Sequence, residues 1–139
     1  MTDDILLNKA QIIRRSIGRV EEEYQGKPGH LKNLTRQDSI VLNMQRACEA
    51  AIDLAMHAVA AGKMGLSQDS REAFEMLAGH GVIDQQLARS LKAMVGFRNV
   101  AVHNDQALDL GILQAIIEQR LGDLQTFADV LFRPEQTHP

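Results

Sequence analysis

The chain has 139 residues, of which 45% are hydrophobic and 24% are charged, a size and balance that fit one globular domain. We assign residues 1–133 to that domain and residues 134–139 to a flexible tail. The formal net charge of −3 argues against a protein that coats nucleic acid non-specifically, because such binding depends on neutralising phosphates, but it leaves room for a local basic cleft.

The sequence shows no pattern typical of a signal peptide or of a membrane-spanning helix. No apolar run approaches the roughly 20 residues that a membrane-spanning helix needs. The first residues, "MTDDILLNKA", are acidic with a short apolar patch, which is unlike a signal peptide. The single cysteine, Cys48, cannot form an internal disulfide and suits a reducing compartment. We therefore expect a cytoplasmic protein.

Apolar residues recur at helical spacing along the chain, and no stretch shows the strict alternation of a strand. The pattern predicts helices over about 3–25, over roughly 26 residues that begin near Thr35, over 69–79, from Asp84 to about 103, and over about 109–132. Thr35, Ser67 or Asp69, and Asp84 are the expected N-caps. The expected fold is all-α, an antiparallel helical bundle of four long helices and one short helix.

Metal and cofactor chemistry have little support in the sequence. The five histidines show neither HxxxH nor HExxH spacing, one cysteine cannot build a thiolate site, and a glycine-rich phosphate loop is missing. We therefore predict no metal site and no cofactor. His57 follows Asp53 by four residues, a spacing that allows a local carboxylate–imidazole contact with a structural role.

The stretch "GFRNVAVHND" at 96–105 is the strongest candidate for chemistry. On an ideal helix Arg98 and His103 differ by about 140° around the axis, whereas Asn99 shares a face with His103. Fraying near Asn104, where we expect the helix to end, could gather the three side chains around one cleft. An arginine and a histidine suit a phosphodiester, because one binds phosphate oxygens and the other moves a proton near neutral pH. Alternatively, Arg98 and His103 are a pair of cations that balance the helix dipole near its C-terminus, and spacing alone favours this second interpretation.

Three blocks of sequence, in order, resemble the HepT-like branch of the HEPN superfamily. They are "QDSIVLNMQRACEAAIDLAMH" at 37–57, "GLSQDSREAFEML" at 65–77 and "LKAMVGFRNVAVHN" at 91–104, the last of which holds the Arg-x4-His signature. Together they span most of the chain. The resemblance implies a helical-bundle homodimer that acts as a metal-independent ribonuclease toxin, with RNA as its substrate. It also implies a partner, a small minimal nucleotidyltransferase antitoxin of the MntA type.

The resemblance assigns roles to individual residues. Arg98 would bind and polarise the scissile phosphate, Asn99 would orient it, and His103 would act as acid and base, in a cleft built from two copies of the helix. The resemblance and the neighbourhood of the motif also suggest four residues that line the cleft or bind substrate: Asn104, Asp105, Asp38 and Arg46.

One position departs from the family pattern, which is Arg-x4-His-x-Tyr. Asp105 stands at the tyrosine position, and where that tyrosine exists the partner can transfer AMP to it. Asp105 has no phenol, so this mode of control is in question here. The alternative function is a non-catalytic HEPN module that binds nucleotide or docks a nucleotidyltransferase, with Arg98 only as a phosphate clamp. A structural dimerisation bundle is a third possibility.

Overall fold

The computed structural model describes the backbone of residues 3–103 and 109–132 and the side chains of residues 4–96 and 109–132. Within these ranges the chain forms helices and no strand, which confirms the predicted all-α bundle. The elements are α1 (Asp3–Tyr24), the 3-10 helix η1 (Pro28–Lys32), α2 (Leu34–Ala61), α3 (Ser70–Gly79), α4 (Gln85–His103), α5 (Leu110–Gln119) and α6 (Leu121–Leu131). The predicted tail at 134–139 lies outside the described residues.

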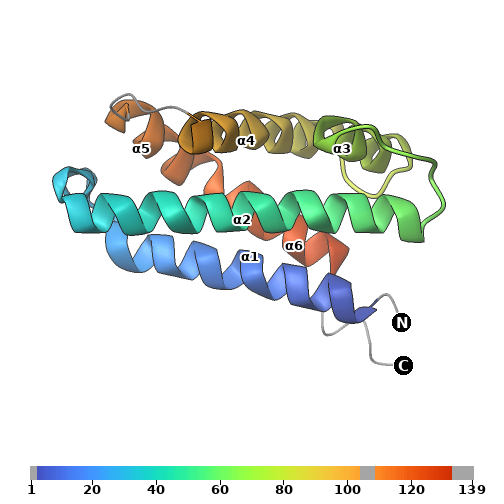
Figure 1. Cartoon of the computed structure of the whole chain (residues 1–139), viewed down its shortest axis with the longest axis horizontal. Coiled ribbons are helices and arrows are strands. Elements are labelled where there is room, and N and C mark those ends of the chain that lie inside the picture. Colours follow the sequence, from blue (N-terminus) through green and yellow to red (C-terminus); the bar gives the residue numbers. More distant parts are fainter. Residues whose placement is uncertain (1–2, 104–108, 133–139) are drawn as a thin grey trace.

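Helix α2 is the centre of the bundle (Figure 1). Helix α1 runs antiparallel along one side of α2, and α3 and α4 lie along the other. Helix α6 packs against both α1 and α2 and also contacts α4. The last turns of α4 therefore reach the end of the bundle that α5 and the start of α2 occupy (Figure 1). None of the described helices is long and apolar enough to cross a bilayer.

The seam between α1 and α2 explains why the first two predicted helices pair. Buried α1 residues alternate in steps of three and four, which aligns them along one stripe of a helix. They face a surface of α2 that is rich in alanine, so the two backbones approach closely. The buried α1 residues are Ala10, Ile13, Ile17, Val20 and Tyr24. The buried residues that α2 contributes to the same core include Ala47, Cys48, Ala51 and Ala55.

The helix starts agree with the sequence in two places and differ in one. Asp69 and Asp84 cap α3 and α4, and each accepts a backbone N–H three residues on, at 2.8 and 2.7 Å. The prediction for α2 is wrong, because Asn33 and not Thr35 is the N-cap; its side chain accepts the Arg36 N–H at 3.0 Å. Asparagine caps at least as well as threonine, and η1 delivers the chain to α2 two residues earlier.

The segment predicted as one helix over about 109–132 is two helices that meet at Arg120. Hydrogen bonds from α4 stabilise the break between the two helices. The buried Ser90 hydroxyl donates to the Asp123 carboxylate and accepts from Arg120 Nη1 at 3.3 Å. These bonds fix both sides of the break. As a result α5 lies against η1, while α6 turns to pack on α1 and α2 (Figure 1).

Two further contacts hold α6 in the bundle. The ring of Phe127 meets Phe74 of α3 edge to face, with centroids 5.6 Å apart at 76°. Arg14 of α1 donates to Asp129 at 2.9 Å and to the carbonyl oxygen of Phe132 at 2.8 Å, which satisfies a carbonyl at the end of α6. The C-terminal helix thus closes the core from the α1 side.

Candidate functional site

Helix α4 carries the motif residues Arg98, Asn99 and His103 on its last turns. The backbone stays helical through His103, so the predicted fraying does not begin before that residue. Along such a helix the positions of Arg98 and His103 differ by about 140° around the axis and by about 7.5 Å along it. Their side chains lie outside the described ones, as do Asn104 and Asp105. Helix geometry alone therefore keeps the two positions apart within one chain.

The position of Arg98 continues the buried stripe of α4. Leu87, Leu91 and Met94 are buried, and their spacing of four and three residues places Arg98 next in the same row. Along this row the residue type therefore changes from apolar to basic at position 98.

Two further predicted residues, Asp38 and Arg46, are exposed on α2. Arg46 lines a groove between α1 and α2, and Asp38 is not among its lining residues. None of the groove's described lining residues comes from α4. The described part of the structure therefore does not bring these two residues together with the α4 motif as one cluster.

The groove contains three residues that the sequence analysis missed: Arg15, Ser16 and Arg19. It has a volume of about 500 Å³ and is lined by Ile12, Arg15, Ser16 and Arg19 of α1 and by Asn43 and Arg46 of α2. The available signal was the basic run "RRSIGR" at 14–19, in which Arg15 and Arg19 are four residues apart and share a helix face. Arg46 lies 27 residues beyond Arg19, so only the folded chain joins them.

The charges of the groove are unevenly balanced. Arg19 donates hydrogen bonds to the carboxylates of Glu22 and Glu23, the latter at 3.0 Å. These bonds raise the pKa of Arg19 above its usual value, and the bond to Glu22 has the larger effect. Arg15 and Arg46 form no ion pair with any residue that the structure describes. The groove therefore presents two guanidinium groups that pair with no carboxylate of the described residues.

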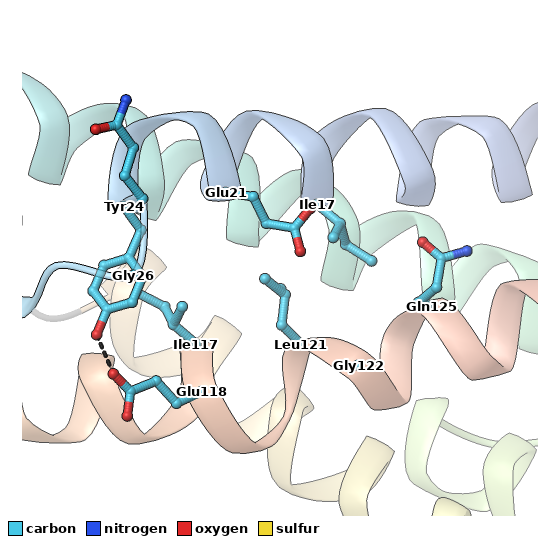
Figure 2. Close-up of a pocket in the computed structure, with 10 residues that line it drawn as sticks. Ile17, Glu21, Tyr24, Gly26, Ile117, Glu118, Leu121, Gly122 and Gln125 are labelled. Atoms are coloured by element: carbon cyan, nitrogen blue, oxygen red, sulfur yellow. Dashed lines mark hydrogen bonds between the residues drawn. The ribbon is translucent and has the colours of Figure 1, made fainter.

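A second hollow, on the other flank of α1, has the opposite character (Figure 2). Its volume is about 620 Å³, and it lies between the end of α1 and helices α5 and α6. Ile17 and Leu121 form apolar walls, and the carboxylate of Glu21 stands beside them (Figure 2). Tyr24 donates its hydroxyl to Glu118 across the hollow, and burial, together with this bond, raises the pKa of Tyr24 to about 12. Carboxylates at this hollow would repel a phosphate.

The expected contact between Asp53 and His57 is wrong. Asp53 pairs instead with Lys9 of α1, at 3.1 Å. His57 Nε2 is buried and has no hydrogen-bond partner among the described residues. A cation from the neighbouring helix thus takes the carboxylate that the i, i+4 spacing had assigned to the imidazole.

The model of one known family, described as "Ribonuclease HepT-like", matches residues 12–131, from the first half of α1 to the end of α6. The chain belongs to the HepT-like ribonuclease family. The matched range of this HepT-like chain includes the α4 motif and both sides of the α1–α2 groove. The resemblance drawn from the three sequence blocks is thereby confirmed.

Similar proteins and structures support the same family. The mRNA nuclease HepT of Shewanella oneidensis is 41% identical over 129 residues, which cover 93% of this chain and 97% of that protein. A solved structure of a tri-AMPylated Shewanella oneidensis HEPN toxin in complex with an MNT antitoxin is 43% identical, with a TM-score of 0.85 over 92% of this chain and 96% of that one. A toxin–antitoxin structure with AMP-PNP is 41% identical, with a TM-score of 0.85 over 93% and 98%.

Proposed function

We propose that this HepT-like chain is a metal-independent endoribonuclease, the toxin of a toxin–antitoxin pair, that cleaves RNA in the cytoplasm with Arg98, Asn99 and His103. The observation that carries the proposal is the family match over 12–131, which includes an α4 that stays helical through the motif. The similarity to a named mRNA nuclease, at 41% identity over nearly the full length, supports RNA as the substrate class.

The chemistry needs only groups that the motif and the substrate supply. The guanidinium of Arg98 binds the two non-bridging oxygens of the scissile phosphate and stabilises the charge that grows there in the transition state. Asn99 orients the phosphate. An imidazole of His103 takes the proton of the ribose 2′-OH, whose oxygen bonds to phosphorus as the bond from phosphorus to O5′ breaks. A protonated imidazole then gives a proton to O5′, and the products are a 2′,3′-cyclic phosphate and a 5′-OH end.

A homodimer is the arrangement that suits this chemistry. Because α4 stays helical, one copy holds Arg98 and His103 about 140° apart around its axis. Two copies of α4 that cross at a twofold axis would place the His103 of one beside the Arg98 of the other. They would also supply two imidazoles, one as base and one as acid, and Asn104 and Asp105 would follow at the mouth of the shared cleft.

We propose a minimal nucleotidyltransferase antitoxin as the partner, which the solved complex of a similar HEPN toxin with an MNT antitoxin supports. Transfer of AMP to a phenol at position 105 is ruled out by Asp105 itself. Tyr24, the one tyrosine of the chain, is only 4% exposed and donates its hydroxyl to Glu118, so it is a poor replacement acceptor. We therefore expect this partner to neutralise the toxin by a route that needs no tyrosine.

Cleavage of single-stranded RNA in EDTA tests the catalytic proposal. Arg98→Ala and His103→Ala should each lower the cleavage rate by at least about 100-fold, while Arg71→Ala, which removes an exposed arginine of α3, should leave it within about twofold. Circular dichroism and size-exclusion chromatography check that the variants stay folded and dimeric. A substrate with a 2′-deoxyribose at the cleaved position should resist cleavage.

Equal cleavage by wild type and His103→Ala would refute the catalytic role. If the wild type binds RNA or the nucleotidyltransferase and cleaves nothing, the chain is the non-catalytic HEPN module instead. If Arg98→Ala binds RNA as tightly as wild type, Arg98 does not act as a phosphate clamp either.

A further inference from the structure

We propose that the groove between α1 and α2 binds one nucleotide of the RNA strand, away from the phosphate that is cleaved. In this proposal Arg15 and Arg46 bind its phosphate, and Ser16 and Asn43 bind the 2′-OH of its ribose. The identity of the ligand as RNA rests on the proposed ribonuclease function. The groove itself rests on three observations: its charge, its buried polar atoms and its size.

The charge of the groove favours a phosphate. Arg15 of α1 and Arg46 of α2 line the same groove, and neither forms an ion pair with a residue in the described ranges. A guanidinium offers a planar fork of donors that matches phosphate oxygens, so two of them on opposite walls fit a single phosphodiester. Arg19, which also lines the groove, is paired with Glu22 and Glu23.

Two buried polar side chains line the groove without a full set of partners. Ser16 is 4% exposed and Asn43 is 5% exposed. The Ser16 hydroxyl forms no hydrogen bond with any described residue. Among all the described residues, His57 Nε2 is the one polar side-chain atom that has neither contact with solvent nor a hydrogen-bond partner, so the Ser16 hydroxyl is not cut off from solvent. The Ser16 hydroxyl is therefore reached from solvent, through the groove that it lines.

The orientation of the Asn43 amide is fixed by α2. Its Nδ2 donates to the Ser39 carbonyl oxygen at 2.8 Å, and a carbonyl can only accept, so the nitrogen must face Ser39. Its Oδ1 then has no donor in the described part of the chain. An acceptor on Asn43 and a hydroxyl on Ser16 that line one groove suit a ribose 2′-OH, which both donates and accepts.

The dimensions limit the ligand to one nucleotide. A volume of about 500 Å³ lies in the usual range for a small-molecule site. A smaller groove of about 340 Å³ continues past Arg46 along the same helices, and its charged lining residues are Lys9, Arg46, Glu49 and Asp53, with Asp53 paired to Lys9 at 3.1 Å. Because positive and negative side chains are mixed there, that groove lacks the excess of positive charge that a second phosphate would need.

An acidic segment of a protein partner is the main competitor for this groove. Its carboxylates would use Arg15 and Arg46 in the same way. They would leave the Asn43 Oδ1 acceptor facing another acceptor, which costs free energy when the group is buried. The groove chemistry therefore favours a ligand that carries a hydroxyl as well as an anion.

RNA affinity in a His103→Ala background tests the groove, by fluorescence anisotropy with a labelled single-stranded RNA. Arg15→Gln and Arg46→Gln should each weaken binding about tenfold, which is the effect of a lost charge-assisted contact. The slope of log affinity against log salt should shrink by about 0.7 for a lost phosphate contact. Arg71→Gln, which removes an exposed arginine from α3, should change affinity less than about twofold. Ser16→Ala should narrow the preference for RNA over DNA of the same sequence by about fivefold.

Each outcome decides for or against the groove. Arg15→Gln and Arg46→Gln variants that bind RNA as well as Arg71→Gln does would overturn it, and so would variants that lose only the antitoxin partner. In the histidine-intact protein the same two substitutions should raise KM and leave kcat unchanged. If the wild type cleaves RNA and the two variants have an unchanged KM, the groove proposal is wrong and the ribonuclease proposal stands. If the wild type cleaves no RNA but binds it in a way that depends on Arg15 and Arg46, the ribonuclease proposal is wrong and the groove proposal stands. If the chain binds no RNA, both proposals are wrong.

Discussion

The two flanks of helix α1 treat polar groups in opposite ways. On one flank Tyr24 donates to Glu118 across the hollow of Figure 2, so its hydroxyl is used up inside the fold. On the other flank Arg15 and Arg46 form no ion pair with a described residue, and the hydroxyl of Ser16, which lines the groove, forms no hydrogen bond with one. Polar groups of the first kind stabilise the bundle. Those of the second kind contribute little to stability and are left available to a ligand.

Removal of Tyr24 is the change that should separate the two flanks most strongly. Tyr24→Ala empties a buried site and strands Glu118, and we expect it to lower the free energy of unfolding by about 3–5 kcal/mol. Arg46→Gln on the other flank should stay within about 0.5 kcal/mol of wild type, because Arg46 is exposed and forms no ion pair with a residue that the structure describes. Urea unfolding followed by circular dichroism measures both. A loss above about 1 kcal/mol in Arg46→Gln would show that the groove holds the fold as well.

Ser90 extends the comparison to the junction of α5 and α6. It is 4% exposed, donates to Asp123 and accepts from Arg120, so Ser90→Ala leaves two charged groups with an unfilled bond. We expect a loss of about 1–3 kcal/mol in the free energy of unfolding. Ser16→Ala is the matched control, since it removes an equally buried hydroxyl that has no such partner, and it should be close to neutral. Equal losses in the two variants would contradict the distinction between used and available polar groups.

The helical pattern predicted most of the fold because it depends on local spacing. The helix over about 3–25 and the cap at Asp84 follow from the spacing of residues in neighbouring turns, and both agree with the structure. The break at Arg120 could not be predicted in this way. The apolar row passes from Ile117 to Leu121 without a change of phase, and the group that fixes the break, Ser90, lies on another helix.

The functional residues divide along the same line. Arg98 and His103 were found because the motif is short and contiguous, and the resemblance of whole blocks gave it a meaning that spacing alone did not. Their roles stay a prediction. The α1–α2 groove was missed because Arg15 and Arg46 come from different helices, and because two similar arginines, Arg14 and Arg19, are occupied by Asp129 and by Glu22 and Glu23. Only the fold tells the occupied arginines from the available ones.

The smallest expected effect is a dependence on alkaline pH that belongs to the Tyr24 flank alone. The pKa of Tyr24 is raised from 10.0 to about 12, because burial disfavours the phenolate and Glu118 accepts the phenol proton in a hydrogen bond. The unfolded chain therefore loses this proton first as the pH rises, and the free energy of unfolding falls between about pH 10 and about pH 12. Below pH 10 the full contribution is present. Tyr24→Phe removes the titrating group, so it should cost about 1 kcal/mol at pH 7 and progressively less as the pH rises through this window.

The difference between wild type and Tyr24→Phe, measured by urea unfolding at pH 7, 10 and 11, isolates this effect, because lysines and arginines titrate alike in both chains. A gap that stays constant from pH 7 to pH 11 would mean that the phenol is not held protonated by the fold. The same series on Arg15→Gln should run parallel to wild type, since Arg15 has no described partner whose bond the pH could break. Parallel curves on the groove flank and converging curves on the tyrosine flank would show that α1 uses one of its sides for stability and keeps the other for binding.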